Sequence, residues 1–237
     1  MKIIFAFIFP ILSFAQEGIF KGYVNDIDDN EYRIIQIGTQ EWLSENLKTT
    51  KFNDGSLVPN IQNEDEWSNL TSGAWSYYDN EIENNLKYGK LYNWYVICPI
   101  TNGGKNICPL GWHVPTEADW SVLINYLGGS ALAGGKLKEM GTSSWDFPNT
   151  GATNSSLFNG LAIGYRYDGQ FINKGNHCNW WSMTEFSMES SKLVYLRENT
   201  ATMFVGIANK KTGLPIRCIR EKSNVEFSKR IKRQRHY

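Results

Sequence analysis

The side chains in this chain that are best suited to take part in chemistry are those of three histidines and four cysteines. His177 beside Cys178 has the composition of a base next to a nucleophile. Adjacent residues in an extended segment point to opposite faces, so this pair is weak evidence for catalysis. His113 lies between Trp112 and Val114 in an apolar turn, where we expect a structural, hydrogen-bonded histidine. The sequence contains no phosphate-binding loop, dinucleotide fingerprint or zinc-ligand spacing, and we expect no catalytic residue in this set.

The dipeptide Trp180-Trp181 offers binding chemistry instead. In an extended segment, one indole should face the interior and the other the solvent. An outward indole beside Asn179, Ser182 and Glu185 would suit stacking on a sugar ring, with polar side chains at the rim. The alternative is that both indoles pack in the core or in an interface.

A second set of candidate ligand-binding residues lies in the irregular segment that follows Gly134, which is rich in Gly, Ser, Thr and Asn. It contains Trp145, Asn149 and Asn154. Long loops of this kind in a compact domain are usually functional. The oxygen atoms available for a calcium ion come from Asp146, Asn149, Asn154 and Glu185, although no spacing requires one. We predict no other metal and no cofactor.

The chain begins with the pattern of an export signal. Lys2 precedes an apolar run, and Ser13 and Ala15 stand at −3 and −1 relative to a cleavage expected before Gln16. The apolar run is too short to span a bilayer, and no cysteine follows it to carry a lipid anchor. We therefore expect residues 1–15 to be removed. The mature protein should be soluble, without a membrane span, and periplasmic, cell-surface or extracellular.

Charge and composition bound the rest of the chain. The 24 basic and 24 acidic residues balance, so no overall field attracts nucleic acid. Residues 16–30 are interpreted as a polar lead-in. Residues 222–237 form a basic tail that we expect to be solvated and disordered; the alternative is binding to nucleic acid or an anionic surface. The folded domain is therefore placed at residues 31–221.

The cysteines are Cys98, Cys108, Cys178 and Cys218. An even number in an exported chain favours disulfides over reactive thiols. Three connectivities are possible, and the sequence does not choose among them. A Cys108–Cys218 bond would close a loop of about 110 residues and contribute roughly 4–5 kcal/mol in the chain-entropy model. The alternatives are Cys98–Cys108 together with Cys178–Cys218, or buried free thiols.

A helix at about residues 117–127 is the central element of the scaffold that must position these groups. Pro115 biases the residue before it toward an extended conformation. Thr116 is a good N-cap, and Asp119 at the N3 position gives a variant of the capping box. The helix ends at Gly128-Gly129. One apolar face is formed by Trp120, Leu123, Ile124 and Leu127.

Strands are expected around this helix, mainly in the C-terminal half. Residues 32–43 are typical of two short strands around a Gly-Thr-Gln turn, and residues 158–175 of a hairpin that turns at Asp168-Gly169. Further strands are expected at 192–198, 202–209 and 214–221, and a short helix near 64–70. The pattern predicts a loop-rich α+β domain with one main helix and a small antiparallel sheet.

The chain resembles the Fibrobacter succinogenes major paralogous domain. Its motifs occur in the order typical of that family: IGTQEWLSENLK, YGKLYNWYVI, CPLGWHVPTEADW, GGKLKEMGTSSWDFPNTGATN, LFNGLAIGYRYDGQF, NWWSMTE and LPIRCIRE. The resemblance covers about residues 31–221. It implies an exported bacterial protein, and the function of that family is not established.

A more distant likeness concerns HVPTEADW and LPIRCIRE. They are similar to the RLPTEAEW motif and the closing GFRC strand of the formylglycine-generating, sulfatase-modifying factor family. That likeness implies a C-type-lectin-like fold, in agreement with the loop-rich α+β prediction. The oxygen-dependent enzymes carry two nearby late cysteines for copper, whereas here the matching region has Cys178 alone and Cys218 lies on the final strand. The likeness therefore implies the scaffold and not the activity.

These observations predict a secreted, non-catalytic binding module whose ligand is a glycan or a cell-surface polymer. One alternative is an enzyme on the formylglycine-generating scaffold. The other is a self-associating structural or adhesive surface protein. The ligand and the oligomeric state stay open at this point. The candidate ligand-binding residues are Trp145, Asn149, Asn154, Asn179, Trp180, Trp181 and Glu185.

Overall fold

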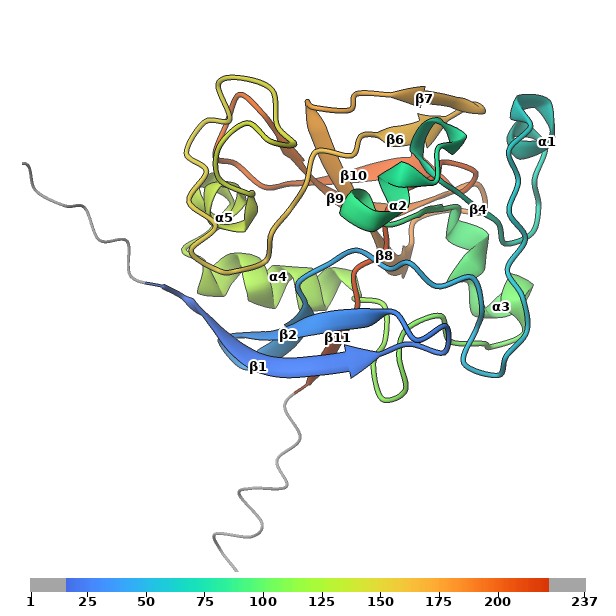
Figure 1. The fold of residues 1–237 in the computed structure, drawn as a ribbon, viewed down its shortest axis with the longest axis horizontal. Helices are drawn as coiled ribbons and strands as arrows, with labels where there is room; N and C mark the ends of the chain where they lie inside the picture. Colours follow the sequence, from blue (N-terminus) through green and yellow to red (C-terminus); the bar gives the residue numbers. More distant parts are fainter. Residues whose placement is uncertain (1–15, 222–237) are drawn as a thin grey trace, which may run out of the picture.

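The computed structural model describes residues 16–221, which form a loop-rich α+β domain (Figure 1). The predicted fold class is therefore confirmed at this level. The strands are β1 Gly18–Asn25, β2 Glu31–Ile37, β3 Gln40–Leu43, β4 Trp75–Ser76, β5 Leu91–Tyr92, β6 Tyr165–Tyr167, β7 Gln170–Ile172, β8 His177–Glu185, β9 Ser190–Arg197, β10 Phe204–Asn209 and β11 Ile219–Glu221. The helices are α1 Glu64–Ser68, α2 Glu83–Tyr88, α3 Pro99–Asn102, α4 Glu117–Tyr126 and α5 Ser130–Leu137, with 3-10 turns η1 Tyr78–Asn80 and η2 Trp94–Val96.

A four-stranded sheet in the order β1-β2-β3-β11 joins the two ends of the described chain (Figure 1). The hairpin predicted at residues 32–43 forms β2 and β3, and Ile219 of β11 pairs with Trp42 of β3. The segment 16–30, predicted as a lead-in, instead consists mainly of strand β1, antiparallel to β2. Most of its side chains are exposed, because β1 lies at the sheet edge and covers little core. This exposure explains why its composition resembles a lead-in.

A three-stranded antiparallel sheet in the order β10-β9-β8 forms the C-terminal half. Its strands β9 and β10 confirm the predictions at 192–198 and 202–209, and the β6–β7 hairpin turns at Asp168-Gly169 as expected. Successive side chains of β8 point to opposite faces. Trp180 accordingly belongs to one hydrophobic cluster and Trp181 to another. The middle of β8 is therefore buried on both sides.

Helix α4 lies between the two sheets (Figure 1). The predicted capping box forms: Asp119 N donates to Thr116 Oγ1 at 3.3 Å, and Thr116 N donates to Asp119 Oδ2 at 2.8 Å. The ring of Trp120 packs on Trp42 of β3 at 4.8 Å between centroids and on Trp180 of β8 at 6.0 Å. This tryptophan cluster joins the two sheets through the helix, and the predicted helix at 117–127 is confirmed.

Helix α5 contradicts the prediction of an irregular segment beginning at Gly134. Gly134 and Gly135 lie inside this helix and are buried. A Cβ on Gly134 would lie 2.6 Å from both Ala201 O and Thr202 O, and a Cβ on Gly135 would lie 2.3 Å from Gly151 O. The glycines allow close packing against two loops. Their low helix propensity, which predicted a loop, is overridden by that packing.

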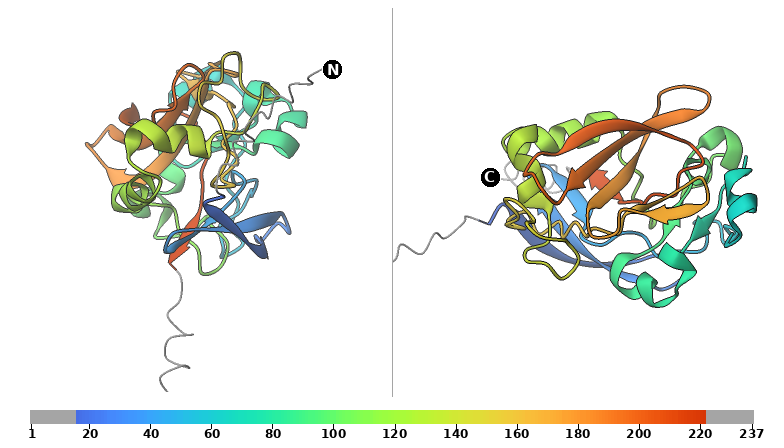
Figure 2. Two further views of the ribbon diagram at one scale, coloured as in Figure 1. Left: turned by 90° about the vertical axis from the view of Figure 1, so that its left-hand side faces the viewer. Right: turned by 90° about the horizontal axis from the view of Figure 1, so that it is seen from above.

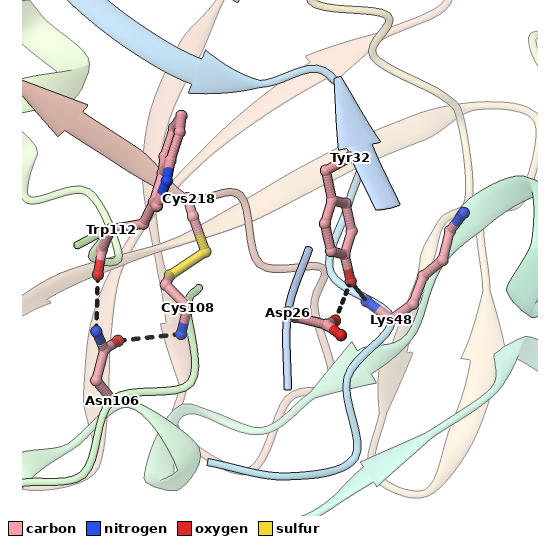
Figure 3. The surroundings of a disulfide bond; sticks show 7 residues. All are labelled: Asp26, Tyr32, Lys48, Asn106, Cys108, Trp112 and Cys218. Atoms are coloured by element: carbon pink, nitrogen blue, oxygen red, sulfur yellow. Dashed lines mark hydrogen bonds between the residues drawn. A yellow bond between two sulfur atoms is a disulfide. The ribbon is translucent and has the colours of Figure 1, made fainter. Parts of the chain in front are cut away.

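A disulfide joins Cys108, which precedes α4, to Cys218, which precedes β11 (Figure 3). Cys98 and Cys178 are buried free thiols. The Cys108–Cys218 connectivity considered from the sequence is therefore confirmed, and the alternative with Cys98–Cys108 and Cys178–Cys218 is wrong. Because the bond links the segment before α4 to the last strand, it ties both chain halves into the same core.

Two polar side chains hold the loops around this bond (Figure 3). The side chain of Asn106 accepts from Cys108 N at 3.0 Å, which fixes the loop that carries the cysteine. The hydroxyl of Tyr32 donates to Asp26 Oδ2 at 2.6 Å and accepts from Lys48 N at 2.8 Å. Tyr32 therefore connects strand β2 both to the β1–β2 turn and to the segment that follows β3.

The remaining helices are short and lie apart from α4 and α5. Seen from above, α4 and α5 lie at one end of the molecule and α1 to α3 at the other (Figure 2). Helix α1 confirms the short helix expected near 64–70. The helices within residues 16–221 all lack the combination of length and apolar character needed to cross a bilayer. The signal peptide expected at 1–15 and the basic tail at 222–237 lie outside the described residues.

Candidate functional site

Trp180 and Trp181 are both fully buried, so the prediction of an outward indole is wrong. They point to opposite faces of β8, as expected for neighbours in a strand. Trp180 Nε1 donates to Asn46 Oδ1 at 2.8 Å, and Trp181 Nε1 donates to Tyr92 O at 2.9 Å. Because core covers both faces at this point, neither indole is available to stack on a ligand.

Trp145 and Asn149 are also buried and serve the structure of their own loop. Trp145 Nε1 donates to Gly160 O at 2.8 Å. The side-chain nitrogen of Asn149 donates to Glu139 O at 2.9 Å and to Gly141 O at 2.6 Å. The prediction that these two side chains face a ligand is therefore wrong, because they close the irregular segment on itself.

Two of the residues considered as calcium ligands are engaged elsewhere. Glu185 is exposed and forms an ion pair with Lys210. Asn154 accepts from Asn159 N at 2.9 Å through its side-chain oxygen, and it lines a small pocket beside strand β1. Within residues 16–221, no group of three or more His, Cys, Asp or Glu residues is placed to hold a metal ion.

Asn179, also a predicted ligand-binding residue, lies in a larger pocket with aromatic walls. We call this the sheet-face pocket, since it opens on the face of the β8–β9–β10 sheet opposite Trp180 and α4. It encloses about 440 Å³, a size typical of small-molecule sites. Its lining is aromatic and polar: Tyr165, Tyr167, His177, Asn179, Leu193, Tyr195, Arg197, Gly206, Ile207, Ala208, Asn209, Thr212 and Leu214.

A row of rings crosses the strands along this pocket. The ring of Tyr195 is stacked with His177 at 6.3 Å between centroids and 4° between planes, and with Phe204 at 4.9 Å and 15°. The ring centroid of Tyr165, from β6, lies 6.1 Å from the ring centroid of His177. Gly206 gives the tyrosine its room, because any larger residue would meet the ring. The pocket therefore has a continuous, half-buried aromatic surface.

Asn179 contributes a polar group at the base of the pocket, directly across the sheet from Tyr195. Its residue surface is only 5% exposed. Among the described residues, its side-chain nitrogen has no hydrogen-bond partner. A buried donor left unpaired costs about 1–3 kcal/mol. A hydroxyl or carbonyl that reached the base of the pocket would recover that loss.

His177 adds a titratable group to the pocket wall. Burial lowers the pKa of His177, and the positive charge of Arg197 lowers this pKa further, while Glu198 acts in the opposite direction. The imidazole is therefore neutral at pH 7 and offers one donor and one acceptor. The adjacent Cys178 faces the other side of the strand, and burial raises the pKa of its thiol. The two side chains accordingly do not form a nucleophile–base pair.

His113 lies outside this pocket. Its main chain pairs with Ile219 in both directions at 2.9 Å, so the residue does hold β11 in place. Its side chain is exposed, and Nε2 lies 3.9 Å from Asp119 Oδ2. The prediction of a hydrogen-bonded structural histidine therefore holds for its backbone and is wrong for its imidazole.

Sequence reasoning missed Tyr195 and Arg197. They alternate with apolar residues in KLVYLRE, and this alternation places Leu193, Tyr195 and Arg197 on one face of β9. An aromatic and a cationic side chain on the same face of a strand are the signal that indicates a half-open surface. The sequence prediction favoured Trp180-Trp181 as the stacking residues instead, because tryptophan offers a larger stacking area than tyrosine.

The fold and the site together define a loop-rich α+β domain with an aromatic, amide-containing pocket on one sheet face. The chain belongs to the family described as the Fibrobacter succinogenes major domain, whose model matches residues 35–220. This match confirms the resemblance stated from the motifs. It spans the disulfide and every residue of the sheet-face pocket. Comparison with curated proteins and with solved structures finds no match.

Proposed function

We propose that this domain is a non-catalytic binding module that takes a glycan of a cell-surface or extracellular polymer in the sheet-face pocket. The observation that carries the proposal is the combination of a half-exposed row of rings with the unpaired amide of Asn179. Sugar rings present apolar C–H faces and hydroxyl groups. The apolar faces can pack on the rings of Tyr165 and Tyr195. The hydroxyl groups can form hydrogen bonds with Asn179, His177 and Thr212.

The proposal includes export and a C-type-lectin-like scaffold. The pairing of segments from both ends of the described chain in one sheet, with long loops between them, supports the scaffold. The Cys108–Cys218 bond supports export, since disulfides persist in oxidising compartments.

A glycan array tests this function directly. The mature protein is compared with Tyr195→Ala and Asn179→Ala, which alter the pocket, and with the matched control Val205→Ala. Val205 lies on the same sheet, is 50% exposed and does not line the pocket. We expect both pocket variants to lose binding and the control to keep it. Binding to no glycan, or equal loss in the control, would contradict the proposal.

Strand β1 supports a second candidate function, self-association. Ile19, Phe20 and Tyr23 are 57%, 49% and 56% exposed on this edge strand, and edge strands offer backbone groups for pairing with another chain. Light scattering over a concentration series, with Phe20→Lys as the test variant, checks this candidate. A monomer at every concentration would dismiss it.

A further inference from the structure

The charge in the sheet-face pocket is one-sided. Arg197 is the permanently charged residue among its lining residues, and that lining contains no aspartate or glutamate. Glu198 follows in the chain, but it does not line the pocket. Within residues 16–221, the ion pairs formed by arginine involve Arg33 and Arg220 and not Arg197. A binding surface with an unneutralised arginine favours a ligand that carries negative charge.

Arg197 is also held in a defined place. Its guanidinium carbon lies 5.2 Å from the ring centroid of Tyr195 and 5.4 Å from that of Phe204. Stacking on these rings restricts the side chain without using its N–H donors. A planar guanidinium fixed in this way is suited to two parallel hydrogen bonds with a carboxylate.

A second hollow adjoins the pocket at one end. This Trp67 pocket encloses about 230 Å³ and shares Tyr167, Asn209 and Thr212 with the sheet-face pocket. Its charges balance, because Lys211 and Asp168 both line it. The two hollows together form what we call the groove, and its excess positive charge lies at the Arg197 end.

We propose that the groove binds an acidic polysaccharide, with the carboxylate of one hexuronate unit on Arg197 and neighbouring units extending toward Trp67. This inference rests on the proposed glycan-binding function and specifies its ligand class. The ring of the hexuronate packs against Tyr195, and its hydroxyls meet Asn179 and His177.

The experiment uses short oligosaccharides of galacturonate, of mannuronate and of glucuronate-containing hyaluronan, each also as its carboxyl methyl ester. Titration calorimetry measures the affinity of the full mature chain for each pair. We expect at least one acid to bind roughly tenfold or more tightly than its ester, as loss of one charge-assisted contact predicts. Equal affinities for the acids and their esters would overturn the inference.

Variants separate a specific contact from general charge attraction. Arg197→Gln should bind the acid roughly tenfold more weakly and should bind the ester with unchanged affinity. Arg197→Lys should recover part of the lost affinity for the acid. The control Lys21→Gln removes the same charge from an exposed position on β1. A control that weakened binding as much as Arg197→Gln would overturn the contact.

The two proposals fail in different ways. One possible result is that neutral glycans bind in a way that depends on Tyr195, while no acid binds better than its ester. That result would overturn the proposal of an acidic ligand and leave the proposed glycan binding intact. A protein that bound neither acids, esters nor any arrayed glycan would overturn both.

Discussion

Gly206 faces the ring edge of Tyr195 so closely that a Cβ atom on the glycine would lie 3.1 Å from Tyr195 Cε1. The substitution Gly206→Val would therefore push the ring or fill the pocket beside it. We expect glycan affinity to fall roughly tenfold, while stability changes by less than about 0.5 kcal/mol, because valine suits an edge strand. Calorimetric titration and thermal unfolding measure the two quantities.

The matched control for this substitution is Val205→Thr, which changes the neighbouring exposed side chain outside the pocket. If Gly206→Val bound glycans as well as the natural protein, the ligand would occupy another surface.

Helix α5 yields a prediction in which two effects oppose each other. Alanine usually stabilises a helix by about 1 kcal/mol relative to glycine. In Gly134→Ala, however, the new Cβ would lie 2.6 Å from Ala201 O and Thr202 O, which are main-chain atoms with little freedom to move. Such overpacking costs about 1–3 kcal/mol. We expect a net loss of about 1 kcal/mol in urea unfolding, whereas Leu132→Ala, on the exposed face of α5, should stay within about 0.5 kcal/mol. A more stable Gly134→Ala protein would contradict the close packing.

Removal of the disulfide should cost far more than removal of a buried thiol. The Cys108–Cys218 bond closes a loop of 110 residues. The double variant Cys108→Ala/Cys218→Ala should lower the free energy of unfolding by about 4–5 kcal/mol. Cys98→Ala, outside the bond, should lower it by about 1 kcal/mol. Equal losses in the two proteins would show that the bond does not restrict the unfolded chain.

The number of free thiols gives an independent check on the same bond. Cys98 and Cys178 are 5% and 0% exposed, so a thiol reagent should find no reactive group in the folded protein. After unfolding without reductant, it should titrate both of these cysteines and no others. Four titrated thiols would indicate a reduced chain, and none would indicate a second disulfide.

His177 should make stability depend on pH. Burial and Arg197 lower its pKa below the ordinary value of 6.5, so the unfolded state takes up a proton before the folded state does. Stability is therefore complete above pH 6.5 and falls as the pH drops below that value. We expect His177→Gln to reduce the loss of stability between pH 7.5 and pH 5, measured by urea unfolding. His113→Gln, which changes an exposed histidine outside the pocket, is the control; an equal reduction in both variants would show that the burial of His177 is not the cause.

Local sequence signals predicted those elements whose structure is decided locally. The Thr116–Asp119 capping box, the turn at Asp168-Gly169 and the alternation in β9 and β10 all form as expected. Helix α5 was missed because the reason for a glycine at position 134 is its close packing against a loop far along the chain, which the local sequence does not show. Strand β1 was missed because an edge strand buries few side chains, and burial is what periodicity detects.

In the candidate site, too, local patterns predicted the direction of side chains but not the packing around them. Alternation correctly separated Trp180 from Trp181, but it carries no information about what covers each face of a sheet. The core formed by α4 covers one face, and the aromatic residues of the N-terminal half cover the other at that point. Asn179, two positions before Trp181 and on the same face of β8, lies where that second cover ends. The open face is therefore a property of the packed elements, and sequence alone identified a single residue of it.

The covalent loop has a mechanical consequence. Tension between the two ends of the described chain would act on β1 and β11, which belong to one sheet. Once that sheet opened, the force would pass from Cys108 directly to Cys218 and bypass the 110-residue interval between them. At roughly 3.3–3.6 Å per residue, about 370 Å of chain would not extend. Every residue of the sheet-face pocket lies in that interval, so a pulled molecule could lose the β1-β2-β3-β11 sheet while the lining of this pocket stayed outside the path of the load.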